Sequence, residues 1–284
     1  MRDACAVQSE RAATTAREAL AVLILDRSVQ DPYAGDMANP CNRLQEAANE
    51  LLKQLSTRDL AGLPIDTAIV SYGLGGDGQA EVRTTFDGPL AGRTIVRNTE
   101  LPDGAIRVEE AETQVSNGAG GLVTMKKKTP IYFDVEPAAA TPPQAAFEAA
   151  GAMVRDWSLG HPTGAAPMVL HLTRGVHDPA NVDAAAALLA GTGTADGPVR
   201  LYTLVATEAP QKSLAYPDSD AELEGEALRA LWQASSQLPD WEKLQAAKRP
   251  YISAASRGFV VNGKFDILGE EVSNSIAADI AATA

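Results

Sequence analysis

The stretch Leu20–Ser28, LAVLILDRS, is an almost unbroken apolar run that ends on an aspartate, with a serine two positions later. A run this short and this apolar is typical of a strand buried on both faces of a parallel sheet. Asp26 and Ser28 then lie at the carboxyl end of that strand. Because ligands of open α/β sheets bind outside the carboxyl ends of the strands, the sequence predicts a functional edge at Asp26.

Apolar runs of strand length alternate with segments of helical periodicity along the rest of the chain. Strands are expected at Asp66–Tyr72, Glu81–Phe86, Pro167–Thr173 and Val199–Ala206, and helices at Asn42–Ser56, Pro142–Trp157, Val182–Leu189, Asp220–Ala234 and about residues 265–282. This alternation predicts an α/β fold with a doubly wound, mostly parallel central sheet flanked by helices. We expect a single domain over residues 1–284, completed by a C-terminal helical extension at 208–284.

The segment Asp87–Pro130 is rich in glycine and polar residues and contains no long periodic helix. Two strands, Arg107–Gln114 and Gly121–Lys127, are expected around the turn sequence SNGAGG. We interpret 87–130 as an insertion that forms a β-hairpin-like arm. One hypothesis is therefore that the chain is a structural subunit that uses this arm as its contact, although a 5% aromatic content argues against a large, tight interface.

Composition excludes several classes of partner. The chain has 284 residues and a net charge of -13, and its densest basic cluster is Lys126–Lys128, so binding to nucleic acid or to an acidic membrane surface is not expected. Cys5 and Cys41 show no metal-binding spacing and fit a reducing compartment. No signal peptide or membrane-spanning segment is recognised, and we expect a cytoplasmic protein.

Two features of the sequence bear on possible chemistry. The sequence GLGGDG at Gly73–Gly78 matches a dinucleotide-binding pattern, but the strand-like QAEVRTTFD follows it where that mechanism needs a helix, so a turn is favoured. His171 lies inside a predicted strand and is expected to be packed and hydrogen-bonded, whereas His177 lies nearer the functional edge. No serine lies in G-x-S-x-G and no cysteine–histidine cluster suggests zinc, so nucleophilic catalysis has no support.

The tripeptide Asp26-Arg27-Ser28 has three open interpretations. As a phosphatase nucleophile, Asp26 would need a second carboxylate two residues later, where the chain has a hydroxyl. As a metal site, the pair Asp26 and Ser28 could supply a carboxylate and a hydroxyl to a hard cation. As a structural feature, Asp26 would accept hydrogen bonds from neighbouring backbone N–H groups.

Several segments, in the same order along nearly the whole chain, resemble bacterial von Willebrand factor A domains of a cytoplasmic group found in stress and conflict modules. They are VLILDRS-x-x-DPYAGDM, the section from GLGGDG to GAGGLV, ATPPQAAFEAAGAMVRDW, PMVLHLTRG, DGPVRLYTLVAT and SRGFVVN. The resemblance implies a metal-ion-dependent adhesion site at the carboxyl edge of the sheet. Its metal ligands would correspond to Asp26, Ser28 and Thr141.

This chain departs from the family pattern at two further positions. Gln30 replaces the second serine of the first loop, and Arg174 stands where the family has an aspartate. An arginine offers no acceptor to a metal and stays charged. Repulsion between its charge and a divalent ion would be about 8 kcal/mol at 4 Å and an effective dielectric of about 20. We therefore expect a degenerate site, with the guanidinium of Arg174 beside Asp26 in place of a metal.

The leading hypothesis is a non-enzymatic protein–protein interaction module of a multi-component bacterial stress, signalling or defence assembly, with no cofactor. It would bind through the carboxyl-edge loops, and the residues expected to contact a partner are Gln30, Asp36, Arg174 and Asp178. The alternative is a magnesium-dependent hydrolase or metal-bridged ligand binder that uses Asp26, Ser28 and Thr141, with Asp178 as a further candidate.

Overall fold

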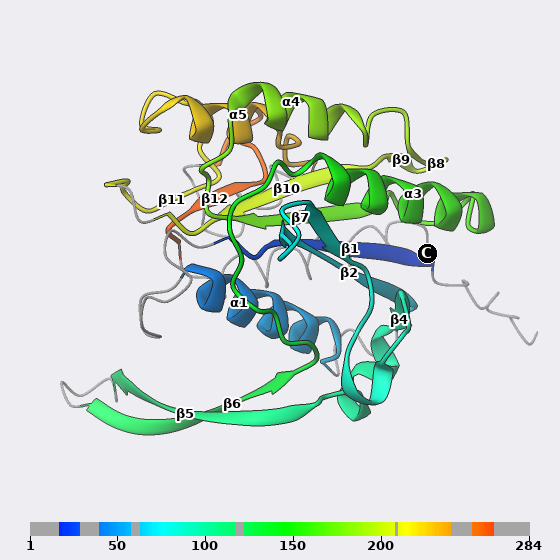
Figure 1. Cartoon of the computed structure of the whole chain (residues 1–284), viewed down its shortest axis with the longest axis vertical. Coiled ribbons are helices and arrows are strands. Elements are labelled where there is room, and N and C mark those ends of the chain that lie inside the picture. The colour runs from blue at the N-terminus through cyan, green and yellow to red at the C-terminus, as the bar shows by residue number, and fades with distance from the viewer. Residues whose placement is uncertain are drawn as a thin grey trace, which may run out of the picture.

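The computed structural model describes residues 17–28, 40–57, 63–116, 122–207, 210–239 and 252–263. Within these residues the fold is mixed α/β and is built on one central sheet (Figure 1). The eight strands of this sheet are β1 (Ala19–Asp26), β2 (Ile65–Leu74), β3 (Ala80–Arg83), β4 (Ile95–Arg97), β7 (Met168–Thr173), β10 (Arg200–Val205), β11 (Leu214–Ala215) and β12 (Phe259–Val261).

The sheet has the order β11-β12-β10-β7-β1-β2-β3, and the short strand β4 also pairs with β2. The strands β1, β2, β7, β10 and β12 are mutually parallel. The strands β3 and β4 run antiparallel to β2, and β11 runs antiparallel to β12. The prediction of a mostly parallel central sheet is therefore confirmed.

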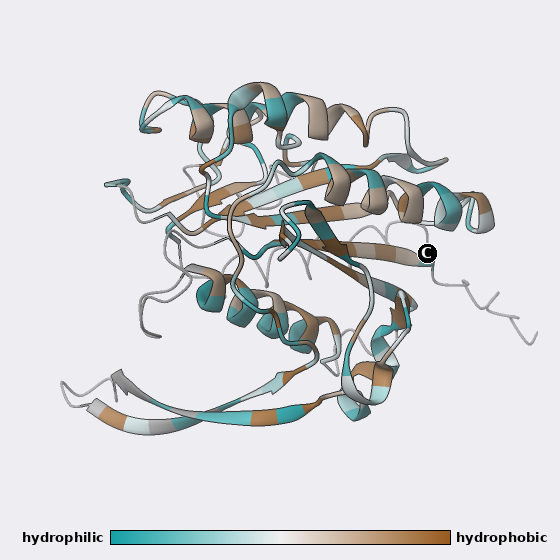
Figure 2. Ribbon diagram, in the orientation of Figure 1, coloured by the Kyte–Doolittle hydropathy of each residue, from teal (hydrophilic) through white to brown (hydrophobic). Residues whose placement is uncertain are grey.

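Helices cover both faces of the sheet (Figure 1). On one face lies α1 (Pro40–Leu55), and on the other lie α3 (Gln144–Gly160), α4 (Pro179–Ala187) and α5 (Glu226–Ala234). The strands of the central sheet are largely hydrophobic, whereas α1 and the paired strands β5 (Arg107–Ser116) and β6 (Leu122–Ile131) beneath it carry many hydrophilic residues (Figure 2). Each predicted helix of the described region is present, although α5 begins at Glu226 instead of Asp220.

Alternation along β1 explains how one strand serves two faces. Leu23 and Leu25 belong to the cluster that packs under α1, and Val22 and Ile24 belong to the cluster under α3. All eight residues of β1 are buried. Because successive side chains of a strand point to opposite faces, a run of apolar residues is what a strand covered on both sides requires.

The GLGGDG motif is a turn. It connects β2 to β3, which pair as an antiparallel hairpin with Leu74 opposite Ala80. Gly75 N–H donates to the carbonyl of Gln79 at 2.7 Å, and Gly78 adopts a φ of 76°, a value that favours glycine. No helix begins here, so the geometry needed to hold a pyrophosphate on a helix N-terminus does not arise.

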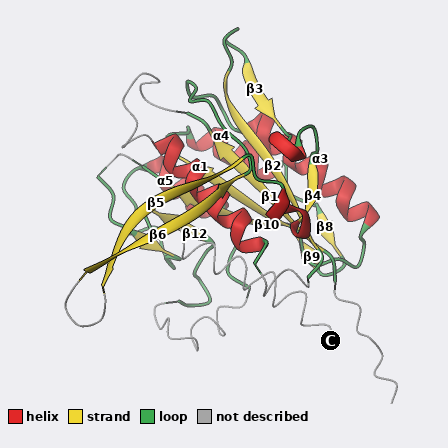
Figure 3. Ribbon diagram, turned by 90° about the horizontal axis from the view of Figure 1, so that it is seen from below, coloured by secondary structure: helices red, strands yellow, loops and turns green. Residues whose placement is uncertain are grey.

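The predicted insertion has two parts. Its first part contains the 3₁₀ turns Gly88–Leu90 and Asn98–Asp103 and contributes β4 to the central sheet. Its second part is an arm of two paired strands, β5 (Arg107–Ser116) and β6 (Leu122–Ile131), that extends away from the body (Figures 1 and 3). Another small hairpin joins β8 (Gly193–Thr194) to β9 (Gly197–Pro198).

The part of the chain after residue 208 is not purely helical in its described segments, because β11 and β12 join the sheet there. The helix expected at about residues 265–282 lies outside the described residues. Within the described parts of the chain, no helix is both long and apolar enough to span a membrane.

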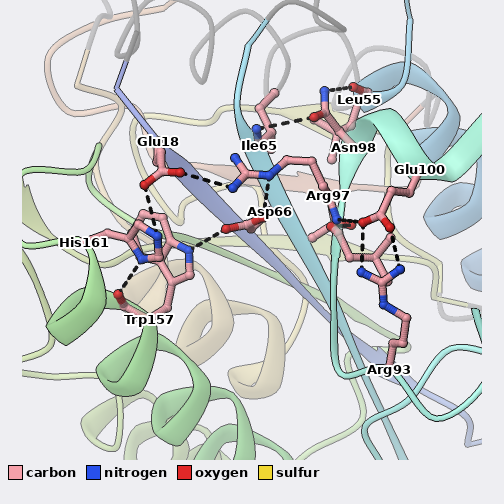
Figure 4. Close-up of polar contacts among 12 residues, drawn as sticks. Glu18, Leu55, Ile65, Asp66, Arg93, Arg97, Asn98, Glu100, Trp157 and His161 are labelled. Atoms are coloured by element: carbon pink, nitrogen blue, oxygen red, sulfur yellow. Dashed lines mark hydrogen bonds and ion pairs between the residues drawn. The ribbon is translucent and has the colours of Figure 1, made fainter. Parts of the chain in front are cut away.

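A polar network ties the elements together at the amino-terminal end of the sheet (Figure 4). Asp66 accepts a hydrogen bond from Trp157 Nε1 at 2.9 Å and pairs with Arg97 Nε at 3.0 Å. Glu18 contacts both Arg97, at 3.1 Å, and His161, at 3.0 Å. The network therefore links the starts of β1 and β2 to the ends of β4 and α3.

Candidate functional site

Strand register brings polar side chains together where β1, β2 and β7 end. Asp26 is the register partner of Tyr72, and Leu25 is the partner of Leu172, which precedes Thr173. Asp26, Tyr72 and Thr173 are 0%, 1% and 0% exposed. Three polar side chains thus meet at the predicted carboxyl edge without contact with solvent.

The carboxylate of Asp26 accepts hydrogen bonds from its own chain on both oxygens. Ser28 N–H donates to Oδ1 at 2.8 Å. Thr173 Oγ1 and the backbone N–H of Arg174 donate to Oδ2 at 2.9 and 3.3 Å. His177 Nε2 lies 3.3 Å from the same oxygen. The charge of Asp26 is therefore compensated by the loops that follow β1 and β7.

His177 belongs to a chain of buried polar side chains. The phenol of Tyr72 lies 2.8 Å from His177 Nε2 and 2.9 Å from His171 Nε2. A phenol has one hydrogen, so it donates to one imidazole and accepts from the other. Because His177 Nε2 also faces the carboxylate of Asp26, a hydrogen on Nε2 satisfies both contacts, and Tyr72 then donates its own hydrogen to His171.

Burial and hydrogen bonding have opposite effects on the acids and bases of this network. Burial disfavours the charged form of Asp26, but the hydrogen bond and charge of His177, together with the bonds from Ser28, lower its pKa to about 2. Burial, with the charge of His177, lowers the pKa of His171 to about 3, so His171 is neutral. Burial also raises the pKa of Tyr72 well above its ordinary value.

A tight turn after β7 brings His177 back to Asp26. Gly175 has a φ of 75°, and a Cβ there would lie 2.7 Å from Val205 Cγ1, so the turn requires glycine. Gly175 N–H donates to Thr173 Oγ1 at 3.2 Å. The turn ends at Asp178, whose side chain accepts from Ala180 N–H at 2.9 Å and caps α4.

The two arginines of the site have different roles. Arg174, expected to place its guanidinium beside Asp26, contributes its backbone N–H there, and its side chain is buried. The imidazole beside the carboxylate is that of His177. Arg27 is 2% exposed and extends to β3, where its Nη2 lies 2.8 Å from Glu81 Oε2.

The other predicted site residues divide into two groups. Ser28 and Thr141 are both buried. Ser28 forms an isolated β-bridge with Ala138, which places the segment just before Thr141 at this edge. Ser28 Oγ has no hydrogen-bond partner within the described structure. Gln30 and Asp36 lie outside the described residues.

Sequence reasoning missed Tyr72 and Thr173 and did not connect His177 to Asp26. Strand alternation carried a signal for them. Residues two apart on a strand share a face, so Tyr72 and Thr173 lie on the same face as Val70 and His171, next to Asp26. Three strands that end in polar residues on one face predict a polar cluster there. The position of His177 beside Asp26 depends on the turn at Gly175, and strand periodicity does not predict that turn.

The described residues do not fit a directly bound divalent ion. Magnesium and calcium bind through several oxygen ligands, and in this part of the chain no three His, Cys, Asp or Glu side chains are grouped to hold a metal. Asp26 is the carboxylate at the site, and its Oδ2 already faces three donors. Asp26 Oδ1, which accepts one hydrogen bond from Ser28 N–H, and the hydroxyls of Ser28 and Thr141 remain, and these three oxygens are fewer than the ligands that a divalent ion takes.

The geometry also differs from that of a nucleophile–histidine–acid triad. In a triad the imidazole uses one ring nitrogen for the acid and the other for the nucleophile. Here the same nitrogen, His177 Nε2, faces Asp26, Thr173 and Tyr72, at 3.3, 3.1 and 2.8 Å. Thr173 also donates its hydrogen to Asp26, so His177 is not arranged to accept a proton from that hydroxyl.

No family model and no curated protein matches this chain. Among solved structures, it is similar to the pilus adhesin SpaC from Lactobacillus rhamnosus GG, with 10% sequence identity and a TM-score of 0.45. The similarity covers 95% of this chain and 31% of the adhesin chain, so this chain spans under a third of the adhesin's length. At this identity and score the similarity carries no functional argument.

Proposed function

We propose that this chain is a non-enzymatic protein–protein interaction module of the von Willebrand factor A type, which binds its partner through the carboxyl-edge loops without a metal. The partner belongs to a multi-component bacterial stress, signalling or defence assembly in the cytoplasm. This partner class comes from the sequence resemblance, and the binding edge comes from the position of the buried cluster around Asp26.

The strand order supports the doubly wound part of this proposal. From β3 to β12 the order is β3-β2-β1-β7-β10-β12, in which the chain builds outward from β1 first on one side and then on the other. In such sheets the crevice for ligands lies where the order reverses. That point lies between β1 and β7, the two strands whose following loops carry Ser28 and Arg174.

One observation supports the metal-free, non-enzymatic proposal: the carboxylate of Asp26 faces donors of its own chain on both oxygens, one on Oδ1 and three on Oδ2. A general acid, base or nucleophile needs a free position toward a substrate. A carboxylate fixed by backbone N–H groups and a buried imidazole instead holds the loops after β1 and β7 in a defined conformation. Preorganised loops favour binding because less conformational entropy is lost.

Affinity capture from the native host, with tagged wild type and two charge reversals, tests the binding face. Arg174→Glu changes the carboxyl edge at a buried position, so thermal unfolding first checks that the variant is folded, and Arg155→Glu is the charge-matched control on the exposed surface of α3. We expect Arg174→Glu to reduce recovery of the co-purifying proteins at least tenfold and Arg155→Glu to leave it unchanged. A chelator in the buffer should have no effect. Equal recovery with both variants would argue against this face.

The metal-bridged alternative is favoured by one observation, the buried and unpartnered Ser28 Oγ. A water or an ion that interacts with this hydroxyl would satisfy it. If capture is lost on addition of EDTA and restored by magnesium, the partner is bridged by a metal. If Asp26→Ala instead abolishes a chelator-sensitive hydrolytic turnover while the fold is retained, the hydrolase alternative applies.

A further inference from the structure

Two basic residues at the carboxyl edge, Arg174 and His177, could keep a divalent ion away from Asp26. The sequence points to Arg174, because it stands where a carboxylate ligand is expected. In the structure Arg174 approaches Asp26 through its backbone N–H, at 3.3 Å. A backbone N–H is present whatever the side chain is, so this contact survives substitution of Arg174.

The imidazole of His177 faces the carboxylate beside the hydroxyl of Thr173. Its Nε2 lies 3.3 Å from Asp26 Oδ2, and the two side chains are 4% and 1% exposed. An ion that used Oδ2 would have to displace this N–H donor from a site without solvent. A donor cannot act as a metal ligand with the nitrogen that carries its hydrogen.

His177 is also held in place from three sides. Tyr72 Oη lies 2.8 Å from its Nε2, and Thr173 Oγ1 lies 3.1 Å from the same atom. The ring of His171 is stacked with that of His177 at a centroid distance of 6.1 Å and an interplanar angle of 19°. Moving the imidazole away from Asp26 would break the contact to Tyr72 and leave buried polar groups unpaired, which is costly.

We infer that His177, anchored by Tyr72, is the residue that excludes divalent cations from the Asp26 site. This inference rests on the proposed function, which assigns partner binding to the same edge without a metal. It adds that restoring the expected carboxylate at position 174 is not sufficient to create a metal site. The Nε2 donor of His177 must be removed from Asp26 as well.

Isothermal titration with magnesium, manganese and calcium tests this on the full chain without any partner. The proteins are wild type, Arg174→Asp, His177→Ala and the double variant Arg174→Asp/His177→Ala. We expect no binding by wild type and at least tenfold tighter binding by the double variant than by Arg174→Asp. Adding Asp26→Asn to the double variant should abolish the heat of metal binding. Its loss would show that the metal binds at Asp26.

Tyr72→Phe is a second, smaller change that tests the same contact. It removes only the hydroxyl that anchors His177, so we expect the variant to fold. Combined with Arg174→Asp, it should bind metal about threefold or more tighter than Arg174→Asp alone. Thermal unfolding of each variant checks that it is folded before titration.

The inference is overturned if wild type binds a divalent ion at Asp26. It is equally overturned if Arg174→Asp alone binds as tightly as the double variant, or if the double variant, shown to be folded, binds none. These outcomes are separate from the capture experiment, which reports on the partner-binding face. A lost partner with Arg174→Glu and a metal-binding wild type would uphold the binding face and reject the role of His177.

Discussion

At the scale of single residues, the site depends on buried groups whose ionisation is set by their neighbours. Asp26 remains charged at 0% exposure because His177 and three other donors face it. His171, at 1% exposure, is neutral and accepts the hydrogen of Tyr72. A buried charge is tolerated only when it is paired and hydrogen-bonded, so removing one member of the network affects the others.

The low pKa of His171 predicts acid sensitivity. The unfolded chain takes up a proton on this residue below about pH 6.5, whereas the folded chain does so only near pH 3. Unfolding therefore binds a proton between these values, and stability falls as the pH is lowered through that window. From pH 7 to pH 5 the loss from His171 is about 2 kcal/mol.

His171→Gln retains an acceptor for Tyr72 and cannot titrate. Urea unfolding at pH 7 and pH 5 should show a pH dependence smaller than that of wild type by about 2 kcal/mol. An unchanged difference between the two pH values would show that His171 is not the group responsible. Asp26 affects stability in a separate pH range. Its ionised carboxylate contributes to the free energy of unfolding above its ordinary pKa of 3.8, and this contribution is lost as the pH falls from 3.8 toward 2.

At the scale of elements, the turn after β7 and the start of α4 position the site. Asp178 is exposed, and its carboxylate accepts from Ala180 N–H while Pro179 occupies the first turn of the helix. This is the geometry of an N-cap. Asp178 was expected to contact a partner, and its position in the structure gives it a structural role whether or not a partner also contacts it.

Replacement of the cap separates these two roles. Asp178→Ala should lower the free energy of unfolding by about 1 kcal/mol, and Asp178→Ser should retain most of it, because serine also caps helices. Asp183→Ala, at an exposed position of the same helix, is the control and should change stability by less than about 0.5 kcal/mol. If Asp178→Ser is as stable as wild type but fails to capture a partner, Asp178 contacts that partner.

At the scale of the whole molecule, the arm is largely separate from the central sheet. Its strands pair with each other along ten residue pairs, and they form a two-stranded sheet of their own in the described structure. Its base is tied to α1, where Lys53 Nζ donates to the carbonyl of Lys128 at 3.0 Å. Two strands alone are marginally stable in water, so the body supports the arm more than the arm supports the body.

Replacing residues 109–129 with a two-residue turn should therefore leave a folded body. The variant keeps Arg107, which pairs with Asp134, and the buried Ile131. We expect a single cooperative thermal transition within a few degrees of that of wild type, measured by circular dichroism. Loss of cooperativity would mean that the arm is part of the core. Loss of partner capture with the fold intact would support the arm as a contact surface.

Much of this organisation is predictable from local pattern. Short apolar runs bounded by polar residues identified β1, β2, β7 and β10, and helical periodicity identified the helices between them, because burial on two faces or on one stripe imposes those patterns. The short strands β4 and β11 were not predicted. Strands of three or two residues are too short to show a period, and they form because a neighbouring strand offers an edge.

The sequence by itself determined the succession of the longer strands and helices along the chain and the presence of Asp26 at a carboxyl edge, since both follow from local hydrophobic pattern. Only the tertiary structure decided which side chains contact the carboxylate of Asp26. That choice depends on the turn at Gly175, which returns His177 to the carboxylate and leaves Arg174 to contribute its backbone. Distances between residues far apart in the chain are set by packing, which periodicity does not encode.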